Sequence, residues 1–474
     1  MRSRSSKAFV HFLLVSAALL SGCGGGSDTA STPAPGAGLT PPATPTPPPA
    51  PPAPAPTPPA PPPAPGVSAA CAGFYPSGFL LDTTRTAIST ATPARPAKGV
   101  AFADPTYHTC ITRATAHTAD GVSGFVRNDY SRRQAFNADS TQFIAYALNG
   151  AWHLYNGANF SRIKSLGGPS EIGGDAELQW HPSNPDLLYY VPTNGYGMQL
   201  KELTVSTNTS RVVGNFAARL RARWPTATFA WTKSEGSPSK DGRYWCMMAE
   251  GPNFESLGVF TWDRNTDTIL GMMNTNGERP DHVSMSPSGN YCVLSGDTAR
   301  GTVAYSRDFS TSRTLLTKSE HSDIALDEAG DDIYVSIDYS SAGNGNVFML
   351  NVRTGVRTDL FTTYVSGSTT AVHFSGKAYD KPGWVVMSTY GDTVSNQWLH
   401  KKVFAIQLKA NPKVYNLGLT RARELSGDDA YWSEPHATVN RSFTKILFNS
   451  TWGGTTLDTL DAYQIEIPAD ALKP

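Results

Sequence analysis

The sequence contains few charged residues and no excess of either sign. Charged side chains make up 16% of the 474 residues, and 39 basic side chains balance 39 acidic ones. The sequence contains no basic patch or tail, which argues against nucleic acid as a partner. Beyond one apolar run near the N-terminus, no stretch is long enough to cross a membrane.

Several common catalytic motifs are also missing. The chain has no Gly-x-Ser-x-Gly element, which argues against a Ser-His-Asp hydrolase of that type. It has no phosphate-binding glycine loop. No obvious pair of acidic residues suggests a hydrolase that works with two carboxylates. Any chemistry must therefore come from another pattern.

The N-terminus has the order of a bacterial lipoprotein signal. Basic Arg2, Arg4 and Lys7 precede the apolar run Ala8 to Leu20, which is too short for a standard membrane span. The following Leu-Ser-Gly-Cys sequence matches a lipobox, in which the cysteine is lipidated. We therefore predict a signal peptide over residues 1–23 with Cys23 as the lipidated residue. The alternative is a plain secretory signal with a chance cysteine.

A glycine rather than an aspartate follows Cys23, which favours the outer membrane of a Gram-negative host. We therefore expect an exported protein, lipid-anchored on the periplasmic or surface face of that membrane. Residues 24–70 are predicted to be a disordered linker, since residues 30–66 are nearly all Pro, Ala and Thr. An extended spacer of this kind reaches on the order of 100 Å. That reach suits a protein that meets a large polymer, although a generic lipoprotein linker is the alternative.

Five cysteines are present, and four lie beyond the lipobox. Export permits disulfides. Cys71 and Cys110 are predicted to tie the N-terminal segment to a nearby strand. Cys246 and Cys292 fall on equivalent strands of neighbouring repeats, where they either pair or are simply buried.

The rest of the chain repeats a short pattern. Turns rich in Gly, Asn, Asp and Pro recur at roughly 40 to 60 residues, the period of a four-stranded propeller blade. Short runs of β-branched and aromatic residues follow most turns, as expected for buried strands. These runs are Phe143 to Tyr146, Tyr244 to Met247, Tyr291 to Leu294, Ile333 to Ile337, Trp384 to Met387 and Ile446 to Phe448. A second hairpin follows in each unit, and seven units are predicted.

The last unit lacks one strand, because the chain ends soon after Ala462 to Ile467. The alternating run Thr109 to Arg113 is predicted to supply it, which would join the two ends of the ring and hide open strand edges. Residues 71–474 are thus predicted to form an all-β, seven-bladed β-propeller of four-stranded blades. A β-sandwich or two small all-β domains is the alternative.

Four histidines occupy the same place in the last four units: His282, His321, His373 and His436. Each opens a short run predicted to be the innermost strand of its blade, so the imidazoles should converge at one mouth of the channel. Together with Glu434 they are candidate ligands for a divalent metal, namely Mn²⁺, Zn²⁺ or Ca²⁺. The alternative is that each histidine only hydrogen-bonds a neighbouring blade.

The corresponding position of the first unit holds Tyr130, Arg132 and Arg133. Guanidinium groups bind carboxylate or sulfate in bidentate fashion, so an anionic substrate is expected. These three residues are the candidates for neutralising substrate charge and for removing a proton.

The Ser-Pro-Ser-Gly turn at Ser286 to Gly289 resembles the repeats of TolB and WD40-like propellers. The segment Glu434-Pro435-His436, followed by Lys445 to Ser450, resembles the last blade of oligogalacturonate lyases. That resemblance implies a seven-bladed propeller that holds Mn²⁺ through histidines and a glutamine and cleaves oligouronides by β-elimination. The chain departs from the pattern: Glu434 replaces a histidine, and the expected glutamine is replaced near Tyr431.

The expected partner is therefore an anionic polysaccharide or oligosaccharide. A non-catalytic propeller that binds an envelope protein or a glycan, as TolB-type proteins do, explains the predicted anchor and spacer equally well. The two hypotheses differ in one respect: the lyase requires a metal and the binding protein does not.

Overall fold

The computed structural model describes residues 67–89, 92–168, 171–297, 299–391 and 396–473. The predicted signal peptide with Cys23, and nearly all of the predicted linker, lie outside these residues. The described part is an all-β structure, as predicted, built mostly from consecutive four-stranded antiparallel sheets. This organisation is consistent with a propeller. None of the helices among the described residues is long and apolar enough to cross a membrane.

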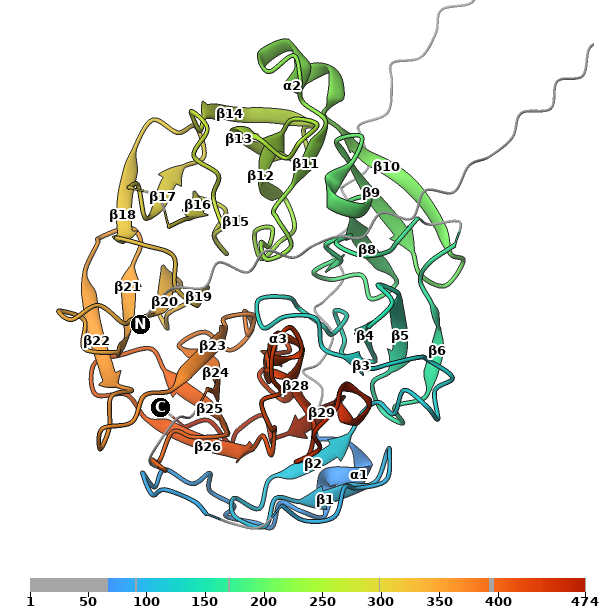
Figure 1. The fold of residues 1–474 in the computed structure, drawn as a ribbon, viewed down its shortest axis with the longest axis vertical. Helices are drawn as coiled ribbons and strands as arrows, with labels where there is room; N and C mark the ends of the chain where they lie inside the picture. Colours follow the sequence, from blue (N-terminus) through green and yellow to red (C-terminus); the bar gives the residue numbers. More distant parts are fainter. Residues whose placement is uncertain (1–66, 90–91, 169–170, 298, 392–395, 474) are drawn as a thin grey trace, which may run out of the picture. The chain divides into compact units, whose positions relative to one another are not determined.

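Within the described residues, five sheets each have four strands that follow one another in the chain. The first sheet contains β7 (Gln179–Trp180), β8 (Leu187–Tyr190), β9 (Gln199–Thr204) and β10 (Thr209–Asn215). The second contains β11 (Phe229–Trp231), β12 (Tyr244–Glu250), β13 (Ser256–Asp263) and β14 (Thr268–Asn274). The third contains β15 (His282–Met285), β16 (Tyr291–Ser295), β17 (Thr302–Ser306) and β18 (Ser312–Leu316). The fourth contains β19 (Ser322–Leu326), β20 (Asp332–Asp338), β21 (Asn346–Asn351) and β22 (Arg357–Thr362). The fifth is β23 (Ala371–Ser375), β24 (Trp384–Tyr390), β25 (Lys402–Gln407), β26 (Val414–Leu419). In Figure 1 these sheets follow one another in chain order about a common middle, with β15, β19 and β23 nearest to it.

The remaining strands combine the two ends of the described chain. They are β1 (Ala101–Ala103), β2 (Cys110–Arg113), β3 (Val126–Arg127), β4 (Gln142–Ala147), β5 (Trp152–Asn156), β6 (Arg162–Ser165), β27 (Thr438–Val439), β28 (Lys445–Ser450) and β29 (Asp461–Glu466). β29 lies between β28 and β2 and is antiparallel to both. It meets β3 at only one residue pair, Asp461 with Val126. The run predicted from Thr109 to Arg113 therefore pairs with the last strand of the chain, and β1 adds a further strand beyond it.

Local sequence explains the strand positions. Each predicted apolar run lies within a second strand of a sheet; Tyr291 to Leu294, for example, is part of β16. The turn before β16 requires Gly289, whose φ is 77°. Any other residue at this position would place its Cβ only 2.4 Å from the Tyr244 ring of the preceding sheet. Apolar residues of neighbouring sheets pack between them: Val335 and Ile337 of β20 share one core with Phe374 of β23 and Val385 of β24.

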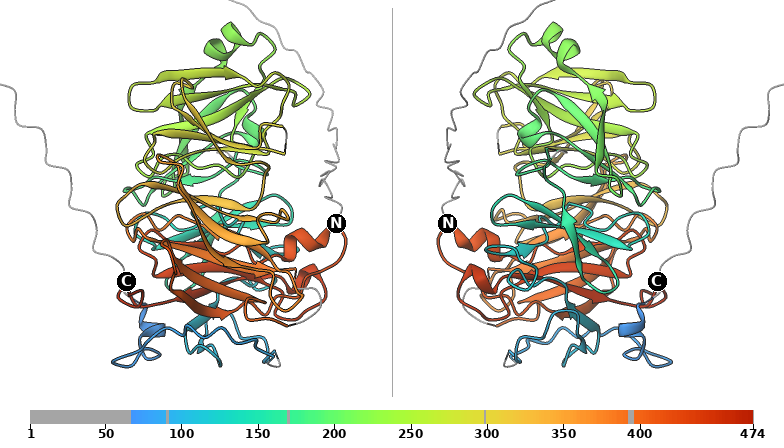
Figure 2. Two further views of the ribbon diagram at one scale, coloured as in Figure 1. Left: turned by 90° about the vertical axis from the view of Figure 1, so that its left-hand side faces the viewer. Right: turned by 90° about the vertical axis from the view of Figure 1, so that its right-hand side faces the viewer.

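Short helices and disulfides complete the structure. The helices are α1 (Ala69–Ala72), α2 (Ala217–Arg223) and α3 (Asp429–Ser433), with single 3-10 turns at Thr193–Gly195 and Leu457–Thr459. Disulfides join Cys71 to Cys110 and Cys246 to Cys292. Residues near α1 lie along β26, where the Asn416 amide donates to Asp82. The side views show α3 standing out from the strands (Figure 2), and this helix leads directly into Glu434.

Candidate functional site

Three predicted site residues converge from two neighbouring sheets. His373 lies in β23, and Glu434 and His436 lie between α3 and β27. One potential ligand atom from each falls within 4.8 Å of the other two. The closest pair is His373 Nε2 and Glu434 Oε2 at 2.7 Å, and His436 Nε2 is 3.5 Å from the same oxygen. We call these three residues the His373 cluster.

Proline and an unusual backbone conformation shape the last two members of this cluster. Pro435 disfavours helix at Glu434, which is extended with φ −64° and ψ 146°, so that α3 ends at Ser433. His436 then has a φ of 39°, a left-handed conformation that costs energy in a residue other than glycine. The Asn128 amide donates to the His436 carbonyl at 2.6 Å and holds this turn in place. Strain retained at one residue by its surroundings is typical of functional sites.

Burial sets the charge of the cluster. The rings of His373 and His436 are almost fully buried, which lowers the pKa of both well below the ordinary value and keeps their nitrogens neutral. Burial also raises the pKa of Glu434 to about 7. His436 Nδ1 has no hydrogen-bond partner in the described structure. Two neutral imidazoles and a carboxylate with no paired cation fit a divalent metal such as Mn²⁺ or Zn²⁺.

His321 lies next to this cluster but contacts two tyrosines. Its ring centroid is 4.4 Å from that of His373. Its Nε2 is 2.9 Å from the Tyr390 hydroxyl, and its Nδ1 is 3.5 Å from the Tyr130 hydroxyl. Burial, together with the neighbouring His373, lowers the pKa of His321 to about 3. The side chain is therefore a neutral imidazole with a hydroxyl close to each nitrogen.

His282 belongs to a second group, with Glu235 and Asp281, which we call the His282 cluster. Here a guanidinium already supplies positive charge. Arg132 Nη1 lies 2.9 Å from His282 Nε2 and forms an ion pair with Glu235. Lys233 Nζ is 3.2 Å from Asp281. The structure therefore places His282 in a different group of candidate ligands from His373 and His436, one in which Arg132 already supplies positive charge.

The second predicted arginine is also occupied. Arg133 pairs with Asp129 and donates from Nη1 to the Leu178 carbonyl at 3.0 Å. Arg132 donates to the carbonyl of Ser322, immediately after His321, and its Cζ lies 5.6 Å from the centre of the Tyr130 ring. Tyr130 itself lies inside the site, with its ring centroid 4.8 Å from that of His436. The structure thus brings Tyr130 to the His373 cluster and engages both arginines with protein groups.

Sequence reasoning missed three residues of this region: Tyr390, Glu235 and Arg127. Tyr390 is the last residue of β24 and stacks on His373 with ring centroids 4.8 Å apart. Tyr390 lies opposite Ala371, in the strand that carries His373. The only signal for it in the sequence was its position at the end of an apolar strand. Glu235 lies between β11 and β12, in a loop whose contacts depend on tertiary structure. Arg127 lies in β3, five residues before Arg132.

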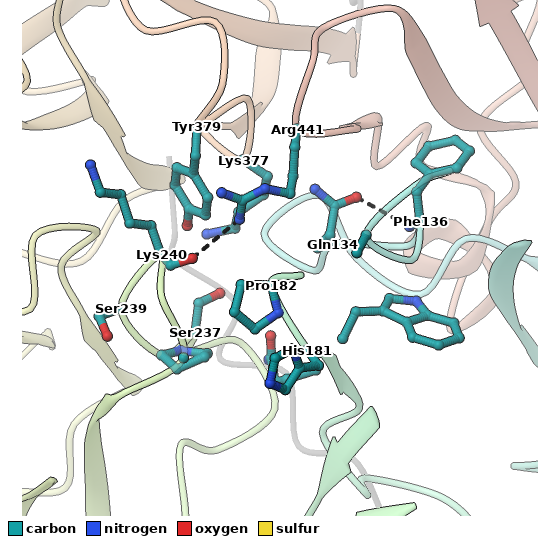
Figure 3. A pocket seen from close by; sticks show the side chains of 15 residues that line it. Gln134, Phe136, His181, Pro182, Ser237, Ser239, Lys240, Lys377, Tyr379 and Arg441 are labelled. Atoms are coloured by element: carbon teal, nitrogen blue, oxygen red, sulfur yellow. Dashed lines mark hydrogen bonds between the residues drawn. The ribbon is translucent and has the colours of Figure 1, made fainter. Parts of the chain in front are cut away.

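A separate cavity lies at the turns between first and second strands (Figure 3). It contains no member of the His373 cluster. Two of its cations have partners: Lys377 is 2.9 Å from Asp323, and Arg441 pairs with Asp380 and donates to the Lys240 carbonyl. The Asp323 carboxylate, two residues after His321 in the sequence, is thereby paired with Lys377, which lines this cavity.

No known family and no curated protein matches the sequence. Solved structures do match. An oligogalacturonate lyase from Vibrio parahaemolyticus superposes with a TM-score of 0.56 and 13% identity over 80% of this chain and 100% of the lyase. The chain shares the fold of this lyase. An oligogalacturonate lyase in complex with manganese gives a TM-score of 0.55 and 15% identity, again over 80% of this chain and 100% of that one.

Proposed function

We propose that this protein is a metal-dependent lyase that cleaves an anionic oligosaccharide or polysaccharide, of the oligouronide class, by β-elimination. The observation that carries the proposal is the His373 cluster, a buried donor set without its own cation, in a chain with the fold of an oligogalacturonate lyase. A similar lyase is described in complex with manganese, which makes Mn²⁺ the first metal to test, ahead of Zn²⁺ and Ca²⁺.

In this proposal the sheets are seven blades. Five are the four-stranded sheets, the sixth is β3 to β6, and the seventh combines β27, β28 and β29 with β2. The pairing of β2 with β29 would close the ring, as the last blades of TolB-like and WD40-like propellers are expected to do. Residues on the innermost strands then share one channel, which accounts for contacts between side chains far apart in the sequence.

The chemistry divides between a metal and the residues around it. A metal held by His373, Glu434 and His436 would withdraw electrons from a uronate carboxylate and acidify the adjacent C5 proton. Tyr130 is the proposed base: its ring lies against His373 and His436, and its hydroxyl is 3.5 Å from the neutral His321 imidazole. That separation is long for a hydrogen bond, but such contacts often shorten when substrate binds.

The proton and electron movements balance as follows. Tyr130 oxygen takes the C5 proton while its own proton passes to His321 Nδ1, and Tyr390 can hydrogen-bond the far nitrogen of the same ring. The C5 electron pair forms the C4–C5 double bond, and the C4–O bond breaks. The departing oxygen takes a proton from water, and the hydroxide left behind takes the proton from His321, which returns the imidazole to its neutral form. Arg132 acts here as a positioning residue, because it contacts the Tyr130 ring and the carbonyl next to His321.

The proposed location follows from the N-terminal sequence. We propose that a lipid on Cys23 and the Pro-rich residues 24–70 hold the enzyme at the bacterial outer membrane. An envelope or environmental polymer would then be within reach of the site.

The purified protein should be assayed with polygalacturonate for unsaturated products by ultraviolet absorbance, beside elemental analysis. We expect one equivalent of metal, product formation that a chelator abolishes and Mn²⁺ restores, and a Tyr130→Phe variant that keeps its metal but forms no product. A folded protein that takes up none of the three metals and releases no unsaturated product would overturn the proposal. The non-catalytic binding protein would then be the better explanation.

A further inference from the structure

Arg127 is a buried guanidinium without the partners that such a group ordinarily has. Its side chain has no exposed surface. Its Nε and Nη1 atoms have no hydrogen-bond partner in the described structure. Arginine is rarely fully buried unless it is paired, since an unsatisfied buried charge is costly. A group in this state is explained most simply by a partner that is not part of the protein.

Aromatic rings hold the guanidinium but do not satisfy its N–H groups. Its Cζ lies 4.9 Å from the Trp432 ring, 5.6 Å from the Tyr431 ring and 5.7 Å from the Phe125 ring. Such contacts stabilise a cation through the ring faces. They do not satisfy its Nε and Nη1 donors, which suit a planar acceptor such as a carboxylate.

The position of Arg127 ties it to the His373 cluster. The next residue, Asn128, donates to the His436 carbonyl at 2.6 Å. The Tyr431 ring that contacts Arg127 also contacts the His436 ring, with centroids 5.2 Å apart. The charge of Arg127 acts on Glu434, His373 and His436 alike. An anion bound to Arg127 would therefore lie beside the cluster.

The contrast with the two predicted arginines is direct. Arg132 and Arg133 are bound by Glu235 and Asp129, whereas no acidic side chain of the described residues forms an ion pair with Arg127 within 4.0 Å. We infer that Arg127, held by Phe125, Tyr431 and Trp432, is the substrate-binding residue for a carboxylate of the acidic sugar. This inference rests on the proposed function and names the residue that would select acidic over neutral substrates.

Two of the rings that contact Arg127 belong to α3. Tyr431 and Trp432 belong to this five-residue helix, and Tyr431 is 45% exposed. Because Arg127 has no exposed surface, its binding of an acidic sugar requires these two rings to move aside.

The test compares an acid with its neutral ester. Binding of trigalacturonate and of its methyl ester to the Mn²⁺-loaded protein would be measured by calorimetry for wild type, Arg127→Met and Arg127→Lys. Because hydrogen bonds to a charged group are worth about 10- to 100-fold in affinity, wild type should prefer the acid by that factor. Arg127→Met should lose the preference and keep ester binding and metal content. Arg127→Lys should keep part of the preference, since it retains charge without the planar fork.

The matched control is Arg264→Gln, which removes a guanidinium 5.2 Å from the Tyr189 ring and far along the chain from the cluster. It should bind both ligands as wild type does. Arg127→Met should also melt no lower than wild type without ligand, whereas a purely structural arginine would lower the melting temperature. An acid preference that survives in Arg127→Met overturns the inference even if the protein is a lyase. An Arg127-dependent preference without unsaturated product supports it and rejects the lyase.

Discussion

The His373 and His282 clusters contain the same kinds of residue, yet they differ in their source of positive charge. Each combines histidine and carboxylate with ligand atoms within 4.8 Å. In the His282 cluster, burial opposes ionisation of Asp281, but His282, Lys233 and Arg132 hold its pKa well below the ordinary value. In the His373 cluster, burial dominates and raises the pKa of Glu434 to about 7. Residue type alone therefore does not separate the two candidate metal sites; the absence of an internal cation is what favours the His373 cluster.

The largest expected effect comes from removing ligands. His373→Ala and His436→Ala should each weaken metal binding by on the order of 100-fold or more, since each deletes one of three donors. His282→Ala is the matched control and should retain the metal, because Arg132 already occupies its cluster. Competition with a coloured chelator measures the affinities. Equal losses of metal affinity in all three variants would contradict the claim that only the His373 cluster is free to bind a metal.

The second test removes the internal cation. Arg132 is 4% exposed and pairs with Glu235, so Arg132→Ala leaves a partly buried carboxylate and His282 without their partner. Breaking a buried pair in this way should lower the free energy of unfolding by about 3 kcal/mol. Arg219→Ala, which breaks an exposed pair with Asp267, should cost about 1 kcal/mol or less. Urea unfolding measures the loss of unfolding free energy in both variants. Equal losses would contradict the claim that Arg132 is the buried internal cation of the His282 cluster.

Much of the fold was predictable because strand signals are local. The run Trp384 to Met387 marked β24, and the alternating run Thr109 to Arg113 marked a strand that pairs with β29. Neither α2 nor α3 was predicted, since both are short and interrupt a β pattern. Three of the four histidines meet because the repeat places them alike. The separation of His282 depends on Glu235, whose loop position only the tertiary structure supplies.

The arginines show the same limit. Arg132 and Arg133 stood out in the sequence because they lie at the repeat position that carries histidine elsewhere. Whether a guanidinium has a partner is a property of the folded protein. Arg127 is without one because its neighbours in space are Phe125, Tyr431 and Trp432, and two of these come from a helix some 300 residues away.

The smallest effect concerns a third buried carboxylate, Glu177, which lies outside both clusters. It accepts hydrogen bonds from the backbone N–H groups of Thr232 and Ser234, yet burial raises its pKa to about 7 from 4.5. It therefore resembles Glu434 in lacking a paired cation, although it has backbone donors. Like Glu434, it should favour the protonated form in the folded protein.

The sign of the pH effect follows from proton binding. Between pH 4.5 and 7 the folded state holds a proton on Glu177 that the unfolded state has released, so its contribution to stability falls as pH rises through this window. At about 1.4 kcal/mol for each pH unit of pKa shift, the loss is at most about 3 to 4 kcal/mol. Glu177→Gln should flatten the dependence of the unfolding free energy on pH in urea titrations from pH 4.5 to 7.5. If the variant and the wild type show parallel curves, backbone N–H groups suffice to keep a buried carboxylate charged. In that case the lack of an internal cation would no longer distinguish the His373 cluster.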